Sequence, residues 1–492
     1  MVTVVTALLR MPMLFEPRWD HDEGVFTTVA WAMSRGFTLY ARIYDLQPPG
    51  IYWLYWALLH AGGEQSHLVV QVAVSLFAMA AAVLTWVVAG RLVSPWAATL
   101  AGCLIGFALA IPVLGGGQLN VELAALPFFL SALALAFSAR PIALIGAGAL
   151  LALALIFRPS FAIDGLALLV PLLSTPNRPA RLVLIAAGGI VVLALAAGGL
   201  WLQGSWAAFV DIVLPSDRRY LLYGNGNSLA PVAVRALVVT IPGALLFIRS
   251  KSLGGRLISV WLPASLAGST LTPVPYTHYV HEALPPLAIG VAMAVDKARA
   301  NRGGWLSIPV SALAMVACAE ALLVLPEIDT ALMRGQTPPS LLSRVSYYES
   351  VPRYYSNWLS LVDGAQSRDA YDSWFSDVAS RRQELAAIRA AGVPPGSNLL
   401  VIGSDSWLYY EGGFDPATPW MQMWVGEWLI PNADDVIDPE IKGGCIDVVV
   451  VDNSVSKFHP EDLTAGGYVP VAGAPWPAYR SVQRAPSCGI TA

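Results

Sequence analysis

Long apolar runs fill the first two thirds of the sequence and constrain the fold more than any other feature. Each run approaches the roughly 20 residues that an α-helix needs to cross a bilayer. Hydrophobic residues make up 56% of the chain and charged residues 13%, whereas soluble proteins have about 25% charged residues. We therefore expect a polytopic α-helical membrane protein. The runs cover about 68–90, 95–112, 120–138, 142–157, 159–173, 181–203, 231–249, 256–271, 279–295 and 305–325.

A shorter apolar run opens the chain at 2–14. Its length of about 13 residues would make about 20 Å of helix, less than the hydrocarbon core of about 30 Å. A signal peptide is the alternative, but the run has no basic segment before it and no small-residue cleavage site before Pro17. We expect a shortened first helix that stays in the chain, and about eleven spans in all.

Basic residues are unevenly divided between alternate loops, which predicts the orientation in the membrane. The loops after residues 90, 138, 173, 249 and 295 hold about ten Lys and Arg in roughly 30 residues, so this side is expected to be cytoplasmic. The opposite loops hold about six cations in roughly three times that length. The segment 16–66 and everything after 326 should then face outward.

The chain changes character at about residue 327, where apolar runs give way to charged and aromatic residues. We expect a membrane module over 1–326 and an extracytoplasmic α/β domain over 327–492. The segment 367–392 has apolar residues at helical spacing, and "SNLLVIG" and "CIDVVVVDN" have the pattern of buried strands. Asp405 and Asp452 follow these strands, where α/β sheets often bind ligands. Because no GxGxxG motif accompanies them, solvated loop acids are the favoured interpretation.

The four cysteines say little about function. Cys103 and Cys318 lie in apolar runs and are expected to pack as small core residues. Cys445 and Cys488 share the outer domain, where a disulfide is one possibility and two free thiols the favoured alternative. No spacing of Cys and His indicates a zinc site.

The stretch "RWDHDEGVF" (18–26) places three carboxylates beside the apolar runs. The residues after it put Val25, Phe26 and Val29 on one helical face, which predicts a short amphipathic helix on the outer surface ending at Gly36. Acids at a helix start cap free N–H groups, and for Asp20 and Glu23 this role is as well supported as a catalytic one. Asp22 can serve both as cap and as general base.

The next stretch, "YARIYDLQPPGIYWLYWALLH" (40–60), predicts a second helix that begins at the Pro48–Pro49 pair, with Asp45 just before it. The first helix carries the chain about 20 Å from Asp22, and the roughly eight residues of the return can span about 26 Å. Asp45 can therefore lie near Asp22.

These two stretches resemble the first outer loop of the GT-C membrane glycosyltransferases, in particular the bacterial relatives of protein O-mannosyltransferases and lipid A aminoarabinose transferases. In that family an acidic motif opens a juxtamembrane helix and a D-x-K-P-P-G stretch follows. "GGQLNVELAALPFFL" (116–130) and "PYTHYVHEALPPLAI" (275–289) are further similarities. One departure is Gln47, where the family often has a Lys that can meet the donor phosphate. Another cation must replace it, or the donor differs.

The resemblance implies an inverting transfer of a hexosyl or pentosyl group from a polyprenyl-phosphate carrier to a lipid, glycan or protein hydroxyl, at the outer face of the bacterial inner membrane. Asp22 would be the base, Asp45 would orient a substrate, and Glu23 would assist. The resemblance implies no certain cofactor, although a divalent metal is possible. Membrane lipids are expected partners, and nucleic acid is not. The implied substrate-binding residues are Asp20, Gln47, Asn120, Glu122, Arg158, Arg218, Arg219, His278 and His281.

Simpler roles compete with several of these assignments. For Arg158, phosphate binding is only slightly favoured over a cation at the membrane edge. A solvated charge pair is slightly favoured for Arg218 and Arg219, which lie in the long loop expected over 211–227. Membrane-interface anchoring is equally supported for His278 and His281. A polar helix cap is the alternative for the remaining pair, Asn120 and Glu122.

Two other classes of protein share the membrane pattern. A secondary transporter usually has ionisable residues at mid-membrane and two repeated halves, but here only Asp164 stands inside an apolar run, close to its outer edge. A non-catalytic scaffold that presents the outer domain would not need the acids of residues 18–26.

Overall fold

The computed structural model describes residues 1–63, 67–224, 228–271, 277–300, 350–421, 433–452 and 465–482, together with the single residues 310, 313 and 463. The chain forms two compact units, each built from segments that are distant in sequence. The first unit comprises Met1–Leu14, Gln71–Ala196 and Leu221–Trp358. The second comprises Phe15–Val70, Ala197–Tyr220 and Leu359–Ala492.

The first unit is helical in the residues described. Several of its helices have a proline in the first turn, as in α5, α7 and α15, because the fixed φ of proline suits this turn and its missing N–H is not needed there. The helices are α1 (Val2–Leu9), most of α4 (His67–Ala89), α5 (Pro95–Ala108), α6 (Val121–Ala136), α7 (Pro141–Phe157), α8 (Phe161–Asp164), α9 (Leu166–Leu173), most of α10 (Arg178–Leu202), α13 (Ala230–Arg249), α14 (Leu253–Ser269) and α15 (Leu284–Arg299), with 3-10 turns η2 (Pro112–Leu114) and η4 (Thr277–Glu282).

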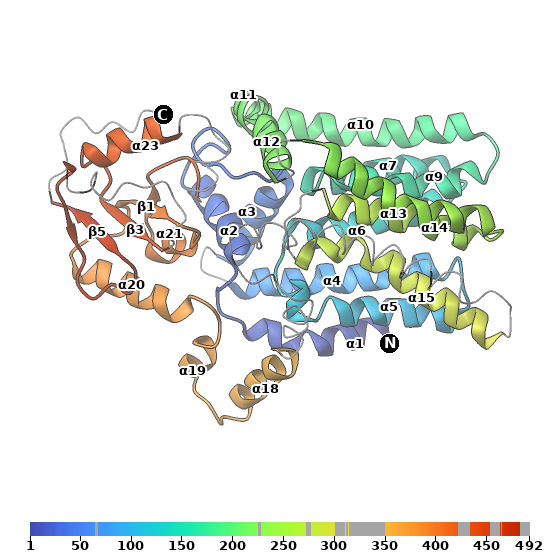
Figure 1. Ribbon diagram of the computed structural model, residues 1–492, viewed down its shortest axis with the longest axis horizontal. Coiled ribbons are helices and arrows are strands. Elements are labelled where there is room, and N and C mark those ends of the chain that lie inside the picture. The colour runs from blue at the N-terminus through green and yellow to red at the C-terminus, as the bar shows by residue number, and fades with distance from the viewer. Residues whose placement is uncertain are drawn as a thin grey trace. The chain divides into compact units, whose positions relative to one another are not determined.

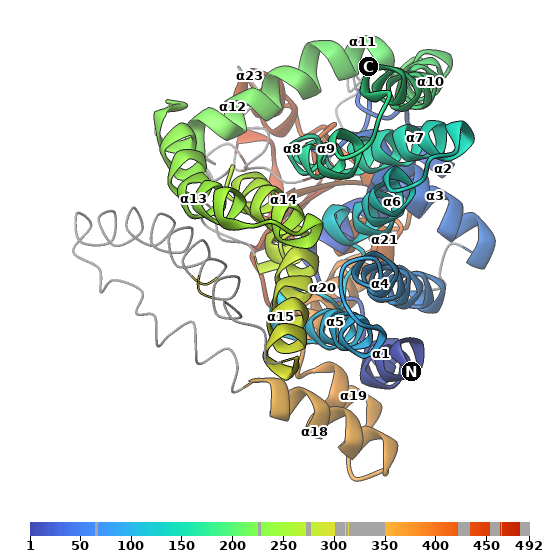
Figure 2. The same cartoon turned by 90° about the vertical axis from the view of Figure 1, so that its right-hand side faces the viewer.

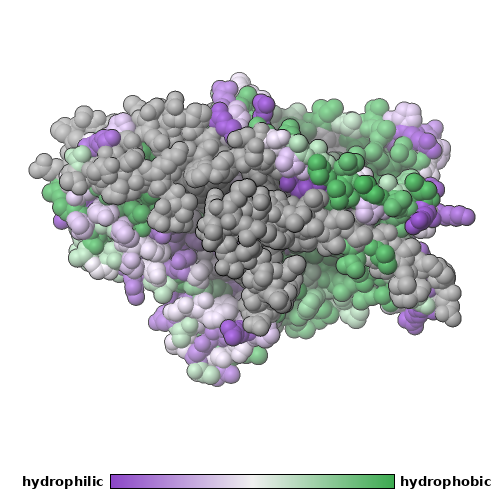
Figure 3. Space-filling view, viewed as in Figure 1, coloured by the Kyte–Doolittle hydropathy of each residue, from purple (hydrophilic) through white to green (hydrophobic). Residues whose placement is uncertain are grey.

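Three described helices, α4, α10 and α13, are long and apolar enough to cross a membrane. Large apolar side chains such as Ile190 and Leu195 on α10 and Ile248 on α13 are exposed, and Figure 3 shows apolar surface gathered over the helices of this unit. Such a surface is expected toward lipid. The expectation of a polytopic helical membrane protein is confirmed. The number of eleven spans stays a prediction, since the run 305–325 lies almost entirely outside the described residues.

Glycines bring several of these helices into backbone contact. Small residues are usual at such contacts in membranes, because no hydrophobic force drives helices together in lipid and close packing holds them instead. A Cβ on Gly102 of α5 would lie 3.0 Å from the carbonyl oxygen of Ala82 on α4 and 2.9 Å from Val2 on α1, and Figure 2 shows these three helices side by side. A Cβ on Gly188 of α10 would lie only 1.9 Å from the carbonyl oxygen of Ile145 on α7. These positions admit no side chain.

The second unit joins an N-terminal helical hairpin to a small C-terminal sheet. The sheet has the order β2-β1-β3-β5-β4, with β1 parallel to β2 and β3, and β5 antiparallel to β3 and β4. Its strands lie between α20 and α23 (Figure 1), which confirms an α/β region in the tail. The elements are α2 (His21–Ser34), α3 (Pro49–Gly62), α11 (Trp206–Ala208), the π-turn η3 (Phe209–Val213), most of α12 (Leu214–Gly224), α18 (Ser350–Val362, shared between the units), α19 (Arg368–Asp372), α20 (Val378–Ala390), β1 (Asn398–Ile402), α21 (Trp407–Gly412), β2 (Asp415–Pro416), α23 (Ala433–Lys442), β3 (Val448–Val451), β4 (Tyr468–Pro470) and β5 (Ala478–Ser481).

The structure differs from the sequence analysis in the environment of α2. Every residue from Glu23 to Ala32 is buried, so α2 is not a surface helix with one apolar face. It packs against both α3 and α21. The segment 211–227 also differs, because residues 214–224 are helical where a loop was expected. The expected boundary at 326 falls outside the described residues, while 15–70 and 197–220 group with the tail.

Cys445 is disulfide-bonded, whereas two free thiols were favoured in the tail. Cys488 and Cys318 lie outside the described residues.

The contact between α7 and α10 yields a matched test on one helix. Gly188→Ala forces a methyl group against the backbone of α7 and should destabilise the protein by about 1–3 kcal/mol, whereas Gly198→Ala points into open space. Thermal unfolding in detergent should show a lower midpoint for Gly188→Ala alone. Equal midpoints for the two variants would show that α7 and α10 are not in backbone contact.

Candidate functional site

Seven of the residues expected to form a site fall in two clusters, one in each compact unit. We call the first the acid hairpin: it is formed by α2, α3 and the loop between them, and it carries Asp20, Asp22, Glu23, Asp45 and Gln47. We call the second the arginine–carboxylate cluster: it is formed by Glu122, Arg158, Ser160 and Glu282.

The acid hairpin begins with a helix cap. The Asp20 carboxylate accepts a hydrogen bond of 3.0 Å from the backbone N–H of Glu23, which satisfies one of the free N–H groups of the first turn of α2. The capping interpretation of Asp20 therefore agrees with the structure.

Glu23 and Asp22 are neighbours in different surroundings. Glu23 is buried, with 2% of its surface exposed, whereas Asp22 is half-buried. Burial raises the pKa of Glu23 well above its usual range, the charges of Asp20 and Glu16 raise it further, and a hydrogen bond with Tyr55 opposes the shift. Burial therefore disfavours the charged form of Glu23. Of the two, Asp22 is the better candidate for accepting a proton.

Asp45 is also buried, and it is held by the second helix of the hairpin. Its carboxylate accepts a hydrogen bond of 2.8 Å from the Tyr52 hydroxyl. Burial raises the pKa of Asp45, although the Tyr52 hydrogen bond lowers it. The same hydroxyl accepts from the backbone N–H of Gln47, whose carbonyl accepts from the Tyr40 hydroxyl. Tyr40 has a left-handed φ of 64° in this loop. Its ring packs edge-on against the ring of Tyr52.

Tyr52 and Tyr55 bring the two acidic segments to one helix. They lie three residues apart on α3, which places them on neighbouring turns of one face. Tyr52 binds Asp45 and Tyr55 binds Glu23, while the ring of Phe26 packs against both tyrosines. The two segments expected to approach each other are thus both anchored on α3.

Arg158 is the centre of the cluster in the first unit. It follows the last residue of α7, and its guanidinium lies 2.5 Å from Glu122 and 2.8 Å from Glu282. The ring of Tyr279 lies 4.3 Å from the guanidinium carbon, a cation–π distance. Glu122 and Arg158 were expected to contact sugar and phosphate separately, but they pair with each other. A phosphate at Arg158 would have to share it with two carboxylates.

One more buried acid, Asp164, lies next to this cluster. Asp164, the possible mid-membrane exception in the sequence, accepts hydrogen bonds from Ser265 at 2.5 Å and Trp261 at 3.2 Å. The carboxyl group of Glu282 lies close enough to act electrostatically on that of Asp164. Glu282 lies in the stretch 275–289, in which only His278 and His281 were expected to be site residues. Its partners lie more than 100 residues away, which no local pattern reveals.

The remaining polar residues of the first unit have structural contacts. Asn120 caps α6 by accepting from the N–H of Leu123 at 2.9 Å, in agreement with its simpler interpretation. His281 is fully buried and its Nε2 lies 2.6 Å from the Leu114 carbonyl oxygen. His278 is half-buried and packs on Gly115, whose φ of 65° and lack of a Cβ allow that approach.

Arg218 and Arg219 are exposed on α12. Arg219 acts electrostatically on Tyr44, the residue before Asp45, so this arginine belongs to the surroundings of the acid hairpin. Gln47 contributes its backbone groups to the Tyr52 network.

The two acids at the strand ends of the tail are structural. Asp452 accepts from the backbone N–H groups of Ser404 and Asp405 at 2.6–3.1 Å, and Gly403 makes room because a Cβ there would overlap the Asp452 carboxylate. Asp405 binds the buried Arg381. Within the described ranges no group of three or more His, Cys, Asp or Glu side chains is arranged to hold a metal ion. A divalent metal thus has no ready set of three such ligands in this part of the chain.

No protein-family model and no curated protein matches the chain. Among solved structures, ArnT from Cupriavidus metallidurans, bound to undecaprenyl phosphate, matches 98% of this chain and 97% of its own length with a TM-score of 0.57 and 16% identity. The chain has a GT-C-type fold. An oligosaccharyltransferase from Archaeoglobus fulgidus matches 98% of this chain and 74% of its own, with a TM-score of 0.44 and 11% identity.

In the order of the chain, the acid hairpin lies between the first helix and α4. The fold also accounts for a tail that combines helices with a small sheet, because the match to ArnT runs through nearly the whole chain.

The pairing of Arg158 leads to a stability test. Arg158→Ala leaves Glu122 and Glu282 as buried carboxylates without their counter-charge, which should cost about 3–5 kcal/mol and lower the thermal midpoint. Adding Glu122→Gln and Glu282→Gln should recover much of the loss. The exposed Arg218→Ala is the control and should have the wild-type midpoint. If Arg158→Ala unfolds like the wild type but loses donor use, Arg158 serves the substrate and not the fold.

Proposed function

We propose that this protein is an inverting glycosyltransferase that moves a sugar from a polyprenyl-phosphate carrier to a hydroxyl group of an acceptor. The observation that carries the proposal is the acid hairpin, which has one half-buried aspartate and two buried acids, in a chain with the GT-C fold. ArnT, which matches 98% of this chain, was solved with undecaprenyl phosphate bound. A sugar donor linked to a polyprenyl phosphate suits a chain with apolar helices long enough to cross a membrane.

The chemistry of this donor needs only one catalytic base. A phosphate is a good leaving group without protonation, so the obligatory carboxylate pair of a glycosidase is not required. Asp22 takes the proton from the acceptor hydroxyl as its oxygen attacks the anomeric carbon. The bond from that carbon to the phosphate oxygen breaks on the opposite face, so the configuration inverts and the polyprenyl phosphate leaves with the electron pair.

The other acids of the hairpin take supporting roles in this proposal. Glu23 forms a hydrogen bond with a hydroxyl of the sugar or the acceptor, while Asp45, fixed by Tyr52, orients a substrate hydroxyl. Asp20 and Gln47 support the hairpin, Asp20 through its cap and Gln47 through its backbone.

The developing negative charge of the phosphate requires cations. Because Gln47 replaces the lysine common in the family, we assign this part to the outer-edge residues Arg158, Arg218, Arg219, His278 and His281. Asn120 and Glu122 stay candidates for sugar hydroxyls. Arg218 and Arg219 are exposed, and Arg158 pairs with two carboxylates.

We further propose that the protein resides in the bacterial inner membrane, with the acid hairpin and the C-terminal sheet outside the cytoplasm. The uneven distribution of Lys and Arg supports this orientation. The donor carries a hexosyl or pentosyl group, the acceptor is a lipid, a glycan or a protein, and surrounding lipids are the remaining partners.

The assignment of the base gives the sharpest functional test. Asp22→Asn keeps the shape of the side chain but cannot accept the proton, so transfer from a polyprenyl-phosphate sugar should fall by about 10²–10⁴-fold with unchanged donor binding and thermal midpoint. Asp20→Asn is the matched control, because Asn caps a helix as well as Asp does. Wild-type turnover by Asp22→Asn would exclude Asp22 as the base, whereas the absence of any transfer by the wild-type protein would favour a transporter or a scaffold.

A further inference from the structure

One face of α2 is fastened to the C-terminal part of the second unit. Three positions at four-residue spacing make the contact, which places them on one side of the helix. The backbone carbonyl of Asp20 accepts a hydrogen bond of 2.7 Å from Trp407 Nε1. Two turns later the Thr28 hydroxyl donates to the Ser406 carbonyl at 2.9 Å.

Gly24, between these two positions, allows the close approach. A Cβ on Gly24 would lie 2.9 Å from the ring of Trp407, so any side chain would push the two apart. Trp407 is 1% exposed and therefore has little room to yield. The contact between α2 and α21 thus depends on the glycine at the first turn of α2.

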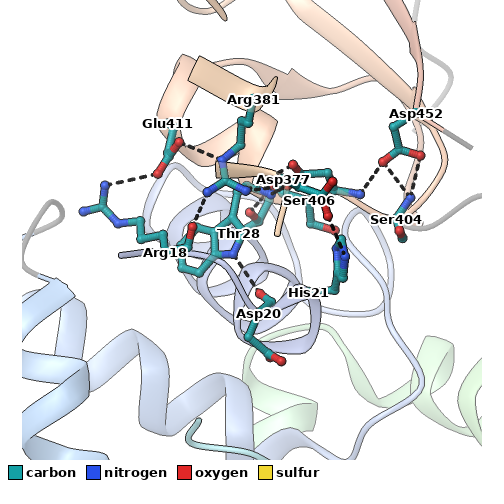
Figure 4. Close-up of polar contacts among 12 residues, drawn as sticks. Arg18, Asp20, His21, Thr28, Asp377, Arg381, Ser404, Ser406, Glu411 and Asp452 are labelled. Atoms are coloured by element: carbon teal, nitrogen blue, oxygen red, sulfur yellow. Dashed lines mark hydrogen bonds and ion pairs between the residues drawn. The ribbon is translucent and has the colours of Figure 1, made fainter. Parts of the chain in front are cut away.

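Arg381 of α20 completes the attachment at the start of α2 (Figure 4). It is 1% exposed and donates to Asp405 at 3.1 and 3.2 Å and to Glu411 at 2.9 Å. Its remaining nitrogen donates to the backbone carbonyl of Arg18, two residues before the Asp20 cap. One guanidinium therefore joins the tail to the chain that enters α2.

The charges of this attachment balance. Arg18 lies 3.5 Å from Glu411 and over the ring of Tyr410, so two arginines face two carboxylates. A buried network in which each charge has partners is rigid, and removing one member leaves the others unpaired.

The tail also holds the loop that carries Asp45. The backbone N–H of Tyr44 donates to the Pro419 carbonyl, and Tyr44 forms a bridge with Trp420. At the far end of α2, Arg35 pairs with Asp415 at 2.9 Å. Both acid-bearing segments of the hairpin are thus attached to residues 381–420.

We propose that Arg381 and Trp407 are positioning residues for the proposed glycosyl transfer: they fix the start of α2 so that Asp22 is presented in one orientation. Asp22 lies two residues after Asp20, about 200° around the helix, on the side away from the attachment. The proposal rests on the proposed function and gives the C-terminal region a part in the reaction. Neither residue contacts substrate in this scheme.

Hydrogen–deuterium exchange of the full-length protein in detergent tests the attachment without any activity. Arg381→Met removes the donors while keeping side-chain length, and amides of α2 should exchange about ten- to a hundred-fold faster. Strands β1 and β3 should keep their protection. The matched control is Arg382→Met on the same helix, since Arg382 is half-exposed and pairs with Asp369 and Asp372. Unchanged exchange in α2 of a folded Arg381→Met protein would overturn the proposal.

A second variant approaches the same contact from the opposite side. Gly24→Ala leaves the charges of the tail intact but pushes α2 from Trp407, and it should accelerate exchange in the first turns of α2 as Arg381→Met does. If Arg381→Met fails to fold, Gly24→Ala decides the question alone. Wild-type exchange in Gly24→Ala would contradict the attachment.

Kinetics then test the positioning role. Arg381→Met should lower kcat at least about tenfold with the donor KM within about threefold, because a misplaced base affects the chemical step more than binding. Arg381→Lys should recover part of kcat, and Arg382→Met should match the wild type. A wild-type kcat in a variant whose α2 exchanges faster would overturn the positioning role. If even the wild type transfers no sugar, the proposed function fails, while the exchange results still decide whether the attachment exists.

Discussion

The burial of α2 is the constraint on which the second unit depends. Every residue from Glu23 to Ala32 is buried, so the helix needs partners on both sides and its carboxylates need hydrogen bonds or a proton. The tyrosines of α3 supply one side, and Trp407 supplies the other against Gly24. The raised pKa of Glu23 follows directly from this burial. Asp22, at the less buried edge, is left as the acid best suited to accept a proton.

Local features of the fold could be predicted well from the sequence. The apolar run at 68–90 corresponds to α4, the Pro48–Pro49 pair opens α3, and "SNLLVIG" contains β1. Each depends on neighbours within a few residues, where periodicity and turn chemistry act. The environment of α2 could not be predicted, because its second partner comes almost 400 residues later and leaves no local pattern. The helix over 214–224 was missed because its charged residues suggested a loop.

The same distinction applies to the candidate site. The caps formed by Asp20 and Asn120 are local and were among the interpretations of the sequence. The pairing of Arg158 with Glu282 joins segments 124 residues apart, and only the folded chain shows that this cation already has partners. A sequence places a charge at the membrane edge, but the charges that balance it come from other helices. The role of Arg381 was hidden for the same reason.

The most direct measurement of the central claim is a cryo-EM structure of the protein with undecaprenyl phosphate bound. We expect lipid density that ends in a phosphate one sugar ring away from the Asp22 carboxylate, with cations around it. A phosphate bound far from the acid hairpin, or a lipid that binds without contacting any of the assigned cations, would contradict the claim that this hairpin carries out glycosyl transfer.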